Sequence, residues 1–421
     1  MTVSIPFKIC LVVVICSLML MKGSTLDLEL QQAIQRAWIH SPALHIVQAD
    51  GEMKEAEEEQ AAKRPNPIAS IQVDGVNGIN RSHNNCNDQE ISYSLTQLIE
   101  LGGKRRARRQ EATFETSLAN YEIESIKLNL LRDVTIAFVE VAAAQEYLKL
   151  ADEQRKIAEE VLSATTIKVQ GGKISLLQQK KAELNRVTTA LAFSKAKRRL
   201  DVAKKKLAIL WGCSEPDFEN VSFSFFEIQD LEELCHLISL QNQNLEVLKS
   251  EILIAAAHGA LAVENAQRIP DLQVTAGYTT CNDNGGEGVL LGVSMPIPIF
   301  DRNQGNIRRA KAQLNQAYHK KEDMLLQQKI ALEEVYEQFY TAYKESLAYR
   351  ESLIPSAKHA FAASKDEYMQ GKNDYLELLD AQRTLFDVQL QYIDILEDYH
   401  RKKAEVDRLV GLPLIQLKNK S

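Results

Sequence analysis

The sequence predicts an α+β fold in which one unit of short strands and long helical hairpins occurs twice. Three observations predict this class. Four segments alternate apolar and polar residues with a period of two, which is typical of strands with different surroundings on their two faces. Two long stretches have the apolar spacing of helices, and each is interrupted by a glycine turn. Short motifs of the first half return in the second at a nearly constant offset.

The composition is that of a globular protein. The chain has 421 residues, of which 45% are hydrophobic and 25% charged, and its net charge is −7. A negative net charge lacks the electrostatic footprint of nucleic-acid binding, so we expect no nucleic-acid partner. Beyond the first two dozen residues, no apolar run approaches the ~20 residues that a membrane helix needs. Short alternating strands would still suit a membrane β-barrel.

Residues 1–24 are typical of a secretory signal peptide, with Lys8 before an apolar core at 9–21 and a polar end. An uncleaved membrane anchor is the alternative. The large Ile15 before Cys16 argues against an acylated N-terminus.

Four cysteines follow the signal, and their spacing matches no metal or redox motif. A disulfide between Cys86 and Cys281 stays open.

The internal repeat sets the predicted domain boundaries. Residues 105–107 (Arg-Arg-Ala) return at 308–310, and Leu210-Trp211-Gly212 returns as Leu409-Val410-Gly411. An offset of about 200 residues is far longer than a solenoid repeat and indicates two copies of a large unit. We therefore predict the following division: signal peptide 1–24, first repeat 25–212, connector 213–230, second repeat 231–411 and C-terminal tail 412–421.

Each copy begins with a helical segment and continues with two strands. The helical segments are 26–63 and 231–268, and the strands are 68–74 and 90–99, then 271–280 and 289–299. A soluble sandwich would show the same alternation. Four strands are too few to close a barrel, which needs at least about eight. Either these strands pack on helices, or several chains combine their strands.

Each copy ends in a long helical hairpin. In the first copy residues 103–169 contain neither proline nor glycine after Gly103, and at ~1.5 Å per residue such a helix is roughly 100 Å long. A turn at 170–173 precedes a returning helix through 176–210. The second copy has helices at 307–369 and 374–409 around a turn at 370–373, and Pro355 predicts a kink. Helices of this length and polarity need partner helices.

A proline-rich stretch, Ser294-Met295-Pro296-Ile297-Pro298-Ile299-Phe300-Asp301-Arg302-Asn303-Gln304-Gly305-Asn306, follows the last strand. Together with the signal, the duplication, the strands and the hairpins, it resembles the TolC-like outer-membrane efflux proteins, in particular the CzcC and CusC branch of heavy-metal cation exporters. The resemblance covers nearly the whole mature chain. It implies that three protomers each give four strands to one 12-stranded outer-membrane barrel, while their helices form a tunnel across the periplasm.

The resemblance places the second glycine turn at a periplasmic gate. Glu377 and Asp380 are three residues apart on a helix and share a face, so threefold symmetry would stack two carboxylate rings that favour cations. Tyr368 matches a tyrosine that ties the closed tip in some members, whereas Asn373 stands where an arginine accompanies it. The first copy departs from this pattern, with Gln178 and Lys181. The alternative is an ordinary solvated helix face.

The hairpin turns and one basic run are the other candidate sites. In the family the turns meet a periplasmic adaptor, and the candidates here are Gly171, Gly172, Lys173, Leu176, Gly371, Lys372 and Leu376. Lys104, Arg105 and Arg106 open a basic run directly after the second strand. We expect them to anchor the chain at the membrane–water boundary, where long cationic side chains reach the lipid headgroups.

No cofactor and no resident metal are predicted. His83, Cys86 and Asp88 could bind a soft cation, although a plain polar loop is the favoured interpretation. The sequence has no GxSxG, HExxH or P-loop motif, so we expect no enzyme activity.

The predicted function is a passive homotrimeric exit duct in the outer membrane, one part of a tripartite efflux system. Its expected partners are a periplasmic adaptor, an inner-membrane pump of the RND type and outer-membrane lipid. The cargo stays open between metal ions, drugs and secreted protein. The alternative function is a periplasmic coiled-coil adaptor or structural protein without a barrel.

Overall fold

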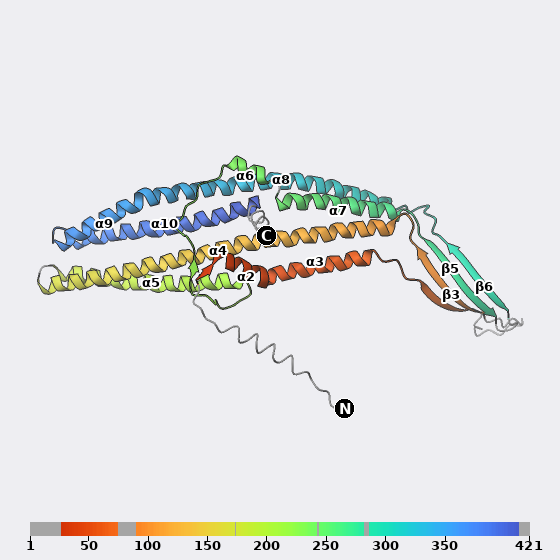
Figure 1. Cartoon of the computed structure of the whole chain (residues 1–421), viewed down its shortest axis with the longest axis horizontal. Coiled ribbons are helices and arrows are strands. Elements are labelled where there is room, and N and C mark those ends of the chain that lie inside the picture. The colour runs from red at the N-terminus through yellow and green to blue at the C-terminus, as the bar shows by residue number, and fades with distance from the viewer. Residues whose placement is uncertain (1–26, 75–89, 173, 242–243, 282–285, 412–421) are drawn as a thin grey trace, which may run out of the picture. The chain divides into compact units, whose positions relative to one another are not determined.

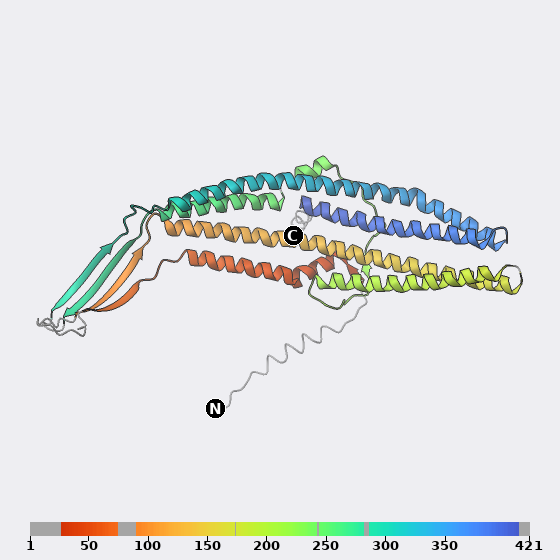
Figure 2. The same ribbon diagram turned by 180° about the vertical axis from the view of Figure 1, so that it is seen from behind.

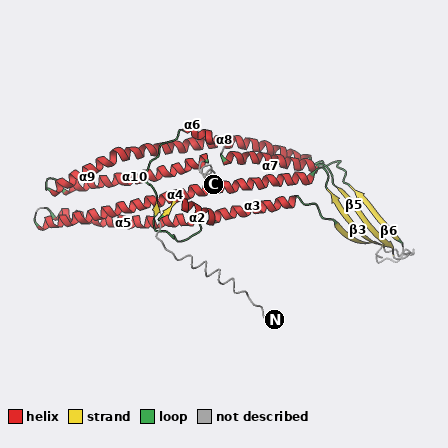
Figure 3. Ribbon diagram, viewed as in Figure 1, coloured by secondary structure: helices red, strands yellow, loops and turns green. Residues whose placement is uncertain are grey.

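The computed structural model describes residues 27–74, 90–281 and 286–411, apart from 173 and 242–243. Helices predominate in these ranges (Figure 3). No helix within them is both long and apolar enough to cross a membrane.

Several predicted features lie outside the described residues. They are the signal peptide 1–24, the tail 412–421, the loop that holds His83, Cys86 and Asp88, and Lys173. The side chain of Cys281 is also outside them, so the Cys86–Cys281 disulfide stays open.

The same order of long elements occurs in both halves of the chain (Figure 1). The first half contains α2 (Leu30–His40), α3 (Pro42–Ala61), β2 (Ile68–Asp74), β3 (Glu90–Ile99), α4 (Lys104–Gln170) and α5 (Leu176–Ile209). The second half contains α6 (Leu234–Gln241), α7 (Leu245–Gln267), β5 (Leu272–Cys281), β6 (Glu287–Ser294), α8 (Gln304–Ala348), the π-helical turn η1 (Tyr349–Leu353), α9 (Ile354–Met369) and α10 (Tyr375–Val410). Two short strands, β1 (Leu28–Glu29) and β4 (Val221–Ser222), were not predicted.

Prolines explain where the elements differ from the prediction. The first helical segment is two helices because Pro42 pushes Ser41 into an extended conformation, with φ −66° and ψ 121°. Strand β6 ends at Ser294, five residues early, because Pro296 and Pro298 have no N–H to donate. Just before Pro355, where a kink is predicted, the α-helix widens into η1, and the Ile354 N–H bonds five residues back to the Tyr349 carbonyl.

The chain forms two compact units, and each draws on both halves of the sequence. Among the described residues, unit 1 contains 27–42, 129–172, 174–232 and 335–406, and unit 2 contains 43–74, 90–128, 233–241, 244–281, 286–334 and 407–411. These units are divided by packing and not by repeat, so the predicted repeat boundaries stay a prediction.

Unit 2 contains an antiparallel sheet in the order β2-β3-β5-β6, whose strands lie side by side in Figure 1. The pairings Ile71↔Tyr93, Tyr93↔Tyr278 and Tyr278↔Val289 place alternate apolar residues of all four strands on one face. These side chains are exposed in the single chain, and Val289 is 77% exposed.

The opposite face of the sheet is lined by hydroxyl groups. The hydroxyls of Ser70 and Ser94 lie 2.9 Å apart, those of Thr96 and Thr275 2.9 Å apart, and those of Ser92 and Thr279 3.4 Å apart. The predicted period of two thus separates an apolar face from a polar one.

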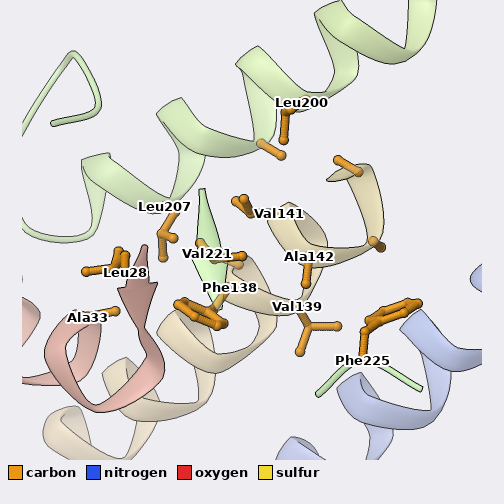
Figure 4. Packing of buried hydrophobic residues seen from close by; sticks show 14 of the residues in the cluster. Leu28, Ala33, Phe138, Val139, Val141, Ala142, Leu200, Leu207, Val221 and Phe225 are labelled. Carbon is orange, nitrogen blue, oxygen red and sulfur yellow. The ribbon is translucent and has the colours of Figure 1, made fainter. Parts of the chain in front are cut away.

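Unit 1 contains the turn-bearing ends of both helical hairpins and an extended apolar core. Helices α4 and α5 lie side by side in both views of the chain (Figures 1 and 2). Phe138 of α4 and Leu207 of α5 are fully buried, together with Val221 of β4 and Leu28 of β1 (Figure 4). The parallel β1–β4 pair therefore fixes the connector on the hairpin.

Candidate functional site

The turn between α9 and α10 is built around Gly371. The Lys372 N–H donates to the Glu367 carbonyl (2.9 Å) and the Gly371 N–H to the Tyr368 carbonyl (3.1 Å), which is a Schellman motif. Gly371 has φ +75°, a conformation that glycine adopts without strain. Gly172, at the end of the α4–α5 hairpin, has φ +67°. The two predicted hairpin turns are therefore present at both glycines.

Tyr368 lies in a small buried cluster where the two hairpins meet within unit 1. Its side chain is 3% exposed, and Tyr375 is 1% exposed. Ala182 of α5 and Leu378 of α10 complete the cluster. The cluster thus joins residues of both hairpins through apolar contacts.

Polar contacts also join the hairpins. The Tyr368 hydroxyl lies 3.2 Å from that of Thr165, which donates its own proton to the Val161 carbonyl, so Tyr368 is the donor. A second bond between the hairpins runs from Gln178 Nε2, which donates to Asp374 Oδ1 (2.7 Å). The hydroxyl bond to Thr165 means that Tyr368 connects α9 to α4 within one chain.

The Tyr375 hydroxyl is buried without a hydrogen-bond partner among the described residues. Burial, with a further contribution from the neighbouring Tyr368, raises the pKa of Tyr375 to about 12. This hydroxyl stays protonated at neutral pH.

Glu377 and Asp380 share one open hollow of about 680 Å³ on unit 1, which we call the tip hollow. Its lining residues are Ala360, Ser364, Asn373, Leu376, Glu377, Leu379, Asp380, Ala381, Arg383 and Thr384. Both carboxylate side chains are exposed, as their spacing of three residues predicts. Arg383 adds a positive charge to the same wall, which weakens the acidic field of a single chain.

Asn373 also lines the tip hollow, and its Nδ2 donates to Glu367 Oε2 (3.2 Å). The structure thus brings Glu377, Asp380 and Asn373 together, while Tyr368 lies buried in the adjacent cluster.

The proposed docking residues lie at exposed positions on the hairpin ends. Leu176 is 61% exposed and Leu376 is 48% exposed. Gly171, Gly172, Gly371 and Lys372 are also exposed.

The basic run at the start of α4 divides into two parts. Lys104 is largely enclosed, and its Nζ lies 2.7 Å from Asp271 Oδ1. Arg105 and Arg106 are exposed. Of the three predicted anchoring residues, Lys104 therefore bonds within the protein, to a residue just before β5, whereas Arg105 and Arg106 are exposed.

Sequence reasoning missed Thr165, Lys168, Tyr375 and Arg383. Arg383 was open to prediction because it lies three residues after Asp380 on the same helix. Thr165 and Lys168 contact Tyr368 of the other hairpin through hydrogen bonds, and Tyr375 packs against Ala182 of α5. These partners lie about 200 residues away in the sequence, so the sequence alone does not indicate them. Within the described ranges, no group of three or more His, Cys, Asp or Glu side chains is placed to hold a metal ion.

Comparison with known proteins gives a consistent match. Residues 33–213 and 237–412 match the family model described as outer membrane efflux protein. The cobalt-zinc-cadmium resistance protein CzcC of Cupriavidus metallidurans is 30% identical over 319 residues, covering 74% of this chain and 75% of CzcC. The nickel and cobalt resistance protein CnrC of the same organism is 25% identical over 311 residues, covering 74% and 73%. The solved structure of CusC superposes with a TM-score of 0.79 at 16% identity and covers 92% of each chain.

Proposed function

Since the chain belongs to the outer membrane efflux protein family, we propose that it is the exit duct of a tripartite efflux system for metal cations. Membership of the family makes it an outer-membrane efflux protein and favours the duct over the alternative of a periplasmic adaptor without a barrel. The family's members are channels, and the expectation that this chain is no enzyme stays a prediction.

The sheet supports assembly of three copies. Strands β2 and β6 end the strand order of the described sheet, so each leaves one edge for pairing with another chain. Its apolar face is exposed in the single chain, which suits contact with lipid. Three copies would give a closed barrel of about 12 strands, above the minimum of about eight. Closure in this way removes every free edge.

The cargo is proposed from the relatives and from the tip hollow. CzcC and CnrC are named for resistance to cobalt, zinc, cadmium and nickel. The observation that carries the proposal for this chain is the pair of exposed carboxylates, Glu377 and Asp380, in one hollow. Repeated by threefold symmetry, they form rings that concentrate cations and repel anions. Tyr368, buried between the hairpins, and Asn373 hold the tip that carries these rings.

The hairpin ends are proposed to bind the adaptor. Leu176 and Leu376 provide exposed apolar side chains beside the glycine turns, and Lys372 adds a charge. Such an end surface fits a helical hairpin of a partner. An inner-membrane pump of the RND type would supply the energy, while this chain conducts passively.

Conductance in planar bilayers tests the proposal. The purified protein is expected to form cation-selective channels, and the double variant Glu377→Ala/Asp380→Ala should lose most of that selectivity. Glu52→Ala/Glu55→Ala is the matched control, because these exposed carboxylates of α3 are also three residues apart. Channels whose selectivity falls equally in both variants would refute the gate. A protein that forms no channel and leaves the membrane in high salt would refute the duct.

A further inference from the structure

A second open hollow, of about 590 Å³, lies at the start of α8 in unit 2. We call it the basic hollow. Four cationic side chains line it, namely Arg268, Arg302, Arg308 and Lys311. No carboxylate is among its lining residues. Its volume lies within the range of roughly 300–1,000 Å³ that small-molecule sites occupy.

The described residues offer no carboxylate partner that neutralises the charge of the basic hollow. In the part of the chain that the structure describes, none of the four cations makes an ion pair. The adjacent Arg309 differs, because its Nη2 lies 3.2 Å from Glu264 Oε1. Of the two neighbouring arginines, Arg309 is therefore paired with a carboxylate, whereas Arg308 is not. Four uncompensated charges in one hollow attract an anion strongly.

The turn before α8 is held in place by hydrogen bonds, so the backbone that carries Arg302 is fixed. Asn303 adopts a left-handed conformation, with φ 56°. Its Nδ2 donates to both the carbonyl oxygen (2.8 Å) and Oε2 (2.7 Å) of Glu264 on α7. The Arg302 N–H donates to Gln304 Oε1 (2.8 Å). These bonds fix the backbone of Arg302 against the first turn of α8.

An exposed apolar surface leads into the basic hollow. Phe300 is 90% exposed and Ile299 is 61% exposed, and both line the hollow. Ile297 (77%) and Val293 (72%) continue this surface back to the apolar face of β6. A ligand that binds both the basic hollow and the adjoining apolar surface must carry an anionic group at one end and hydrocarbon at the other.

We propose that the basic hollow binds the phosphate headgroup of an anionic phospholipid, with its acyl chains against Phe300 and the apolar face of β6. Arginine suits this ligand because its planar fork donates two parallel hydrogen bonds to phosphate oxygens. This proposal rests on the proposed function, which places the apolar face of β6 in the outer membrane. It adds a defined lipid site to the proposed duct. The site is separate from the exposed Arg105 and Arg106.

Lipid retention by the full-length protein tests the proposal without any variant. The purified protein is stripped of lipid in detergent, mixed with phosphatidylglycerol or phosphatidylcholine of identical acyl chains, and examined by native mass spectrometry. We expect at least tenfold greater retention of phosphatidylglycerol, since each cation near a membrane surface contributes about a fivefold preference for anionic lipid. Equal retention of the two lipids overturns the proposal.

Three variants, one of them a matched control, locate the site. The quadruple variant Arg268→Gln/Arg302→Gln/Arg308→Gln/Lys311→Gln should lose this preference. The control Lys195→Gln/Lys197→Gln/Lys358→Gln/Lys365→Gln removes the same charge from exposed positions of α5 and α9 and should keep it. Equal losses would show a nonspecific charge effect and overturn the site. Arg302→Gln alone, in the turn before α8, should reduce the preference about fivefold if the quadruple variant fails to fold.

Two further measurements separate the possible failures. Inorganic phosphate at the same concentration should not displace phosphatidylglycerol, and full displacement would show a phosphate site and overturn the lipid site. Conductance is measured on the same preparation. A conducting protein without lipid preference overturns only this inference, whereas a protein that forms no channel refutes the duct first.

Discussion

The Nζ atom of Lys168 lies 3.8 Å from the centroid of the Tyr368 ring and donates a hydrogen bond to the Tyr368 carbonyl oxygen at 2.9 Å. One ammonium group thus contacts both the aromatic face and a carbonyl in the last turn of α9, where the helix dipole is negative. Lys168 itself lies in the last turn of α4. The ends of two helices from different halves of the sequence are therefore joined inside one chain.

The two tyrosines of this cluster are expected to respond oppositely to loss of the hydroxyl. Tyr368→Phe removes the bond to Thr165 and should lower the free energy of unfolding by about 0.5–1.5 kcal/mol. Tyr375→Phe removes a buried hydroxyl without a partner and should leave the free energy unchanged or raise it by about 1 kcal/mol. Urea denaturation in detergent measures both. If Tyr375→Phe lowers the free energy of unfolding as much as Tyr368→Phe does, the Tyr375 hydroxyl must have a hydrogen-bond partner, and the prediction is wrong.

Gly371→Ala is expected to destabilise the hairpin end. Nothing lies within 4 Å of the added Cβ, so the cost comes from the backbone at φ +75° and amounts to about 1–2 kcal/mol. Gly305→Ala is the control, because its Cβ also meets open space but its φ is not positive, and it lies in α8. There alanine should stabilise the helix by up to about 1 kcal/mol. Amide hydrogen exchange at the turn between α9 and α10 measures this effect. It should be faster in Gly371→Ala than in Gly305→Ala.

His400 is expected to make unit 1 less stable at acidic pH. Its Nε2 lies 2.9 Å from the Phe225 carbonyl, and the rings of Phe223, Phe225 and Tyr399 surround it. Burial is the main cause that lowers the pKa of His400, and Lys403 adds to it. Above an unfolded pKa of about 6.5 both states are neutral. Below it the unfolded state binds the proton more readily, so stability falls by up to about 1.4 kcal/mol per pH unit until the folded pKa is reached.

Unfolding of His400→Gln checks this expectation. Glutamine keeps a donor near the position of Nε2 but does not titrate, so the difference in stability between pH 7.5 and pH 5.5 should shrink relative to the unchanged protein. An equal pH dependence in both proteins would mean that other groups cause it.

Asn303 should be difficult to replace. Asn303→Gly keeps the left-handed backbone but loses the two bonds to Glu264, at a cost of about 1–3 kcal/mol. Asn303→Ala loses the same bonds and adds about 1 kcal/mol of backbone strain. Thermal unfolding of the two variants should rank alanine below glycine. The reverse order would show that backbone conformation does not limit this turn.

Local patterns in the sequence predicted much of the fold. The period of two in residues 68–74 and 90–99 matches β2 and β3, because each strand has one apolar and one polar face. The glycine at 371 marked the hairpin turn because its conformation demands it. Strands β1 and β4 were missed because two residues are too few to show any period.

The sequence predicted the part of the candidate site whose residues lie on a single helix, but not the contacts between different helices. Glu377 and Asp380 share a hollow because three residues turn a helix back to nearly the same face. The burial of Tyr368 was not predicted, since it depends on how Ala182 and Tyr375 pack from other helices. Likewise, the pairing of Lys104 with Asp271 was not predicted, because the two residues are distant in sequence. Lys104 had been expected at the lipid surface.

The hydroxyls along the polar face of the sheet have a consequence for any solute that passes them. Serine and threonine side chains are short and uncharged, and here they bond to one another across neighbouring strands. Such a surface wets readily, yet much of its bonding capacity is already used internally. In the proposed duct, a hydrated ion would keep its water shell along these hydroxyls and meet little friction there, so the hydroxyls by themselves would add little discrimination between ions.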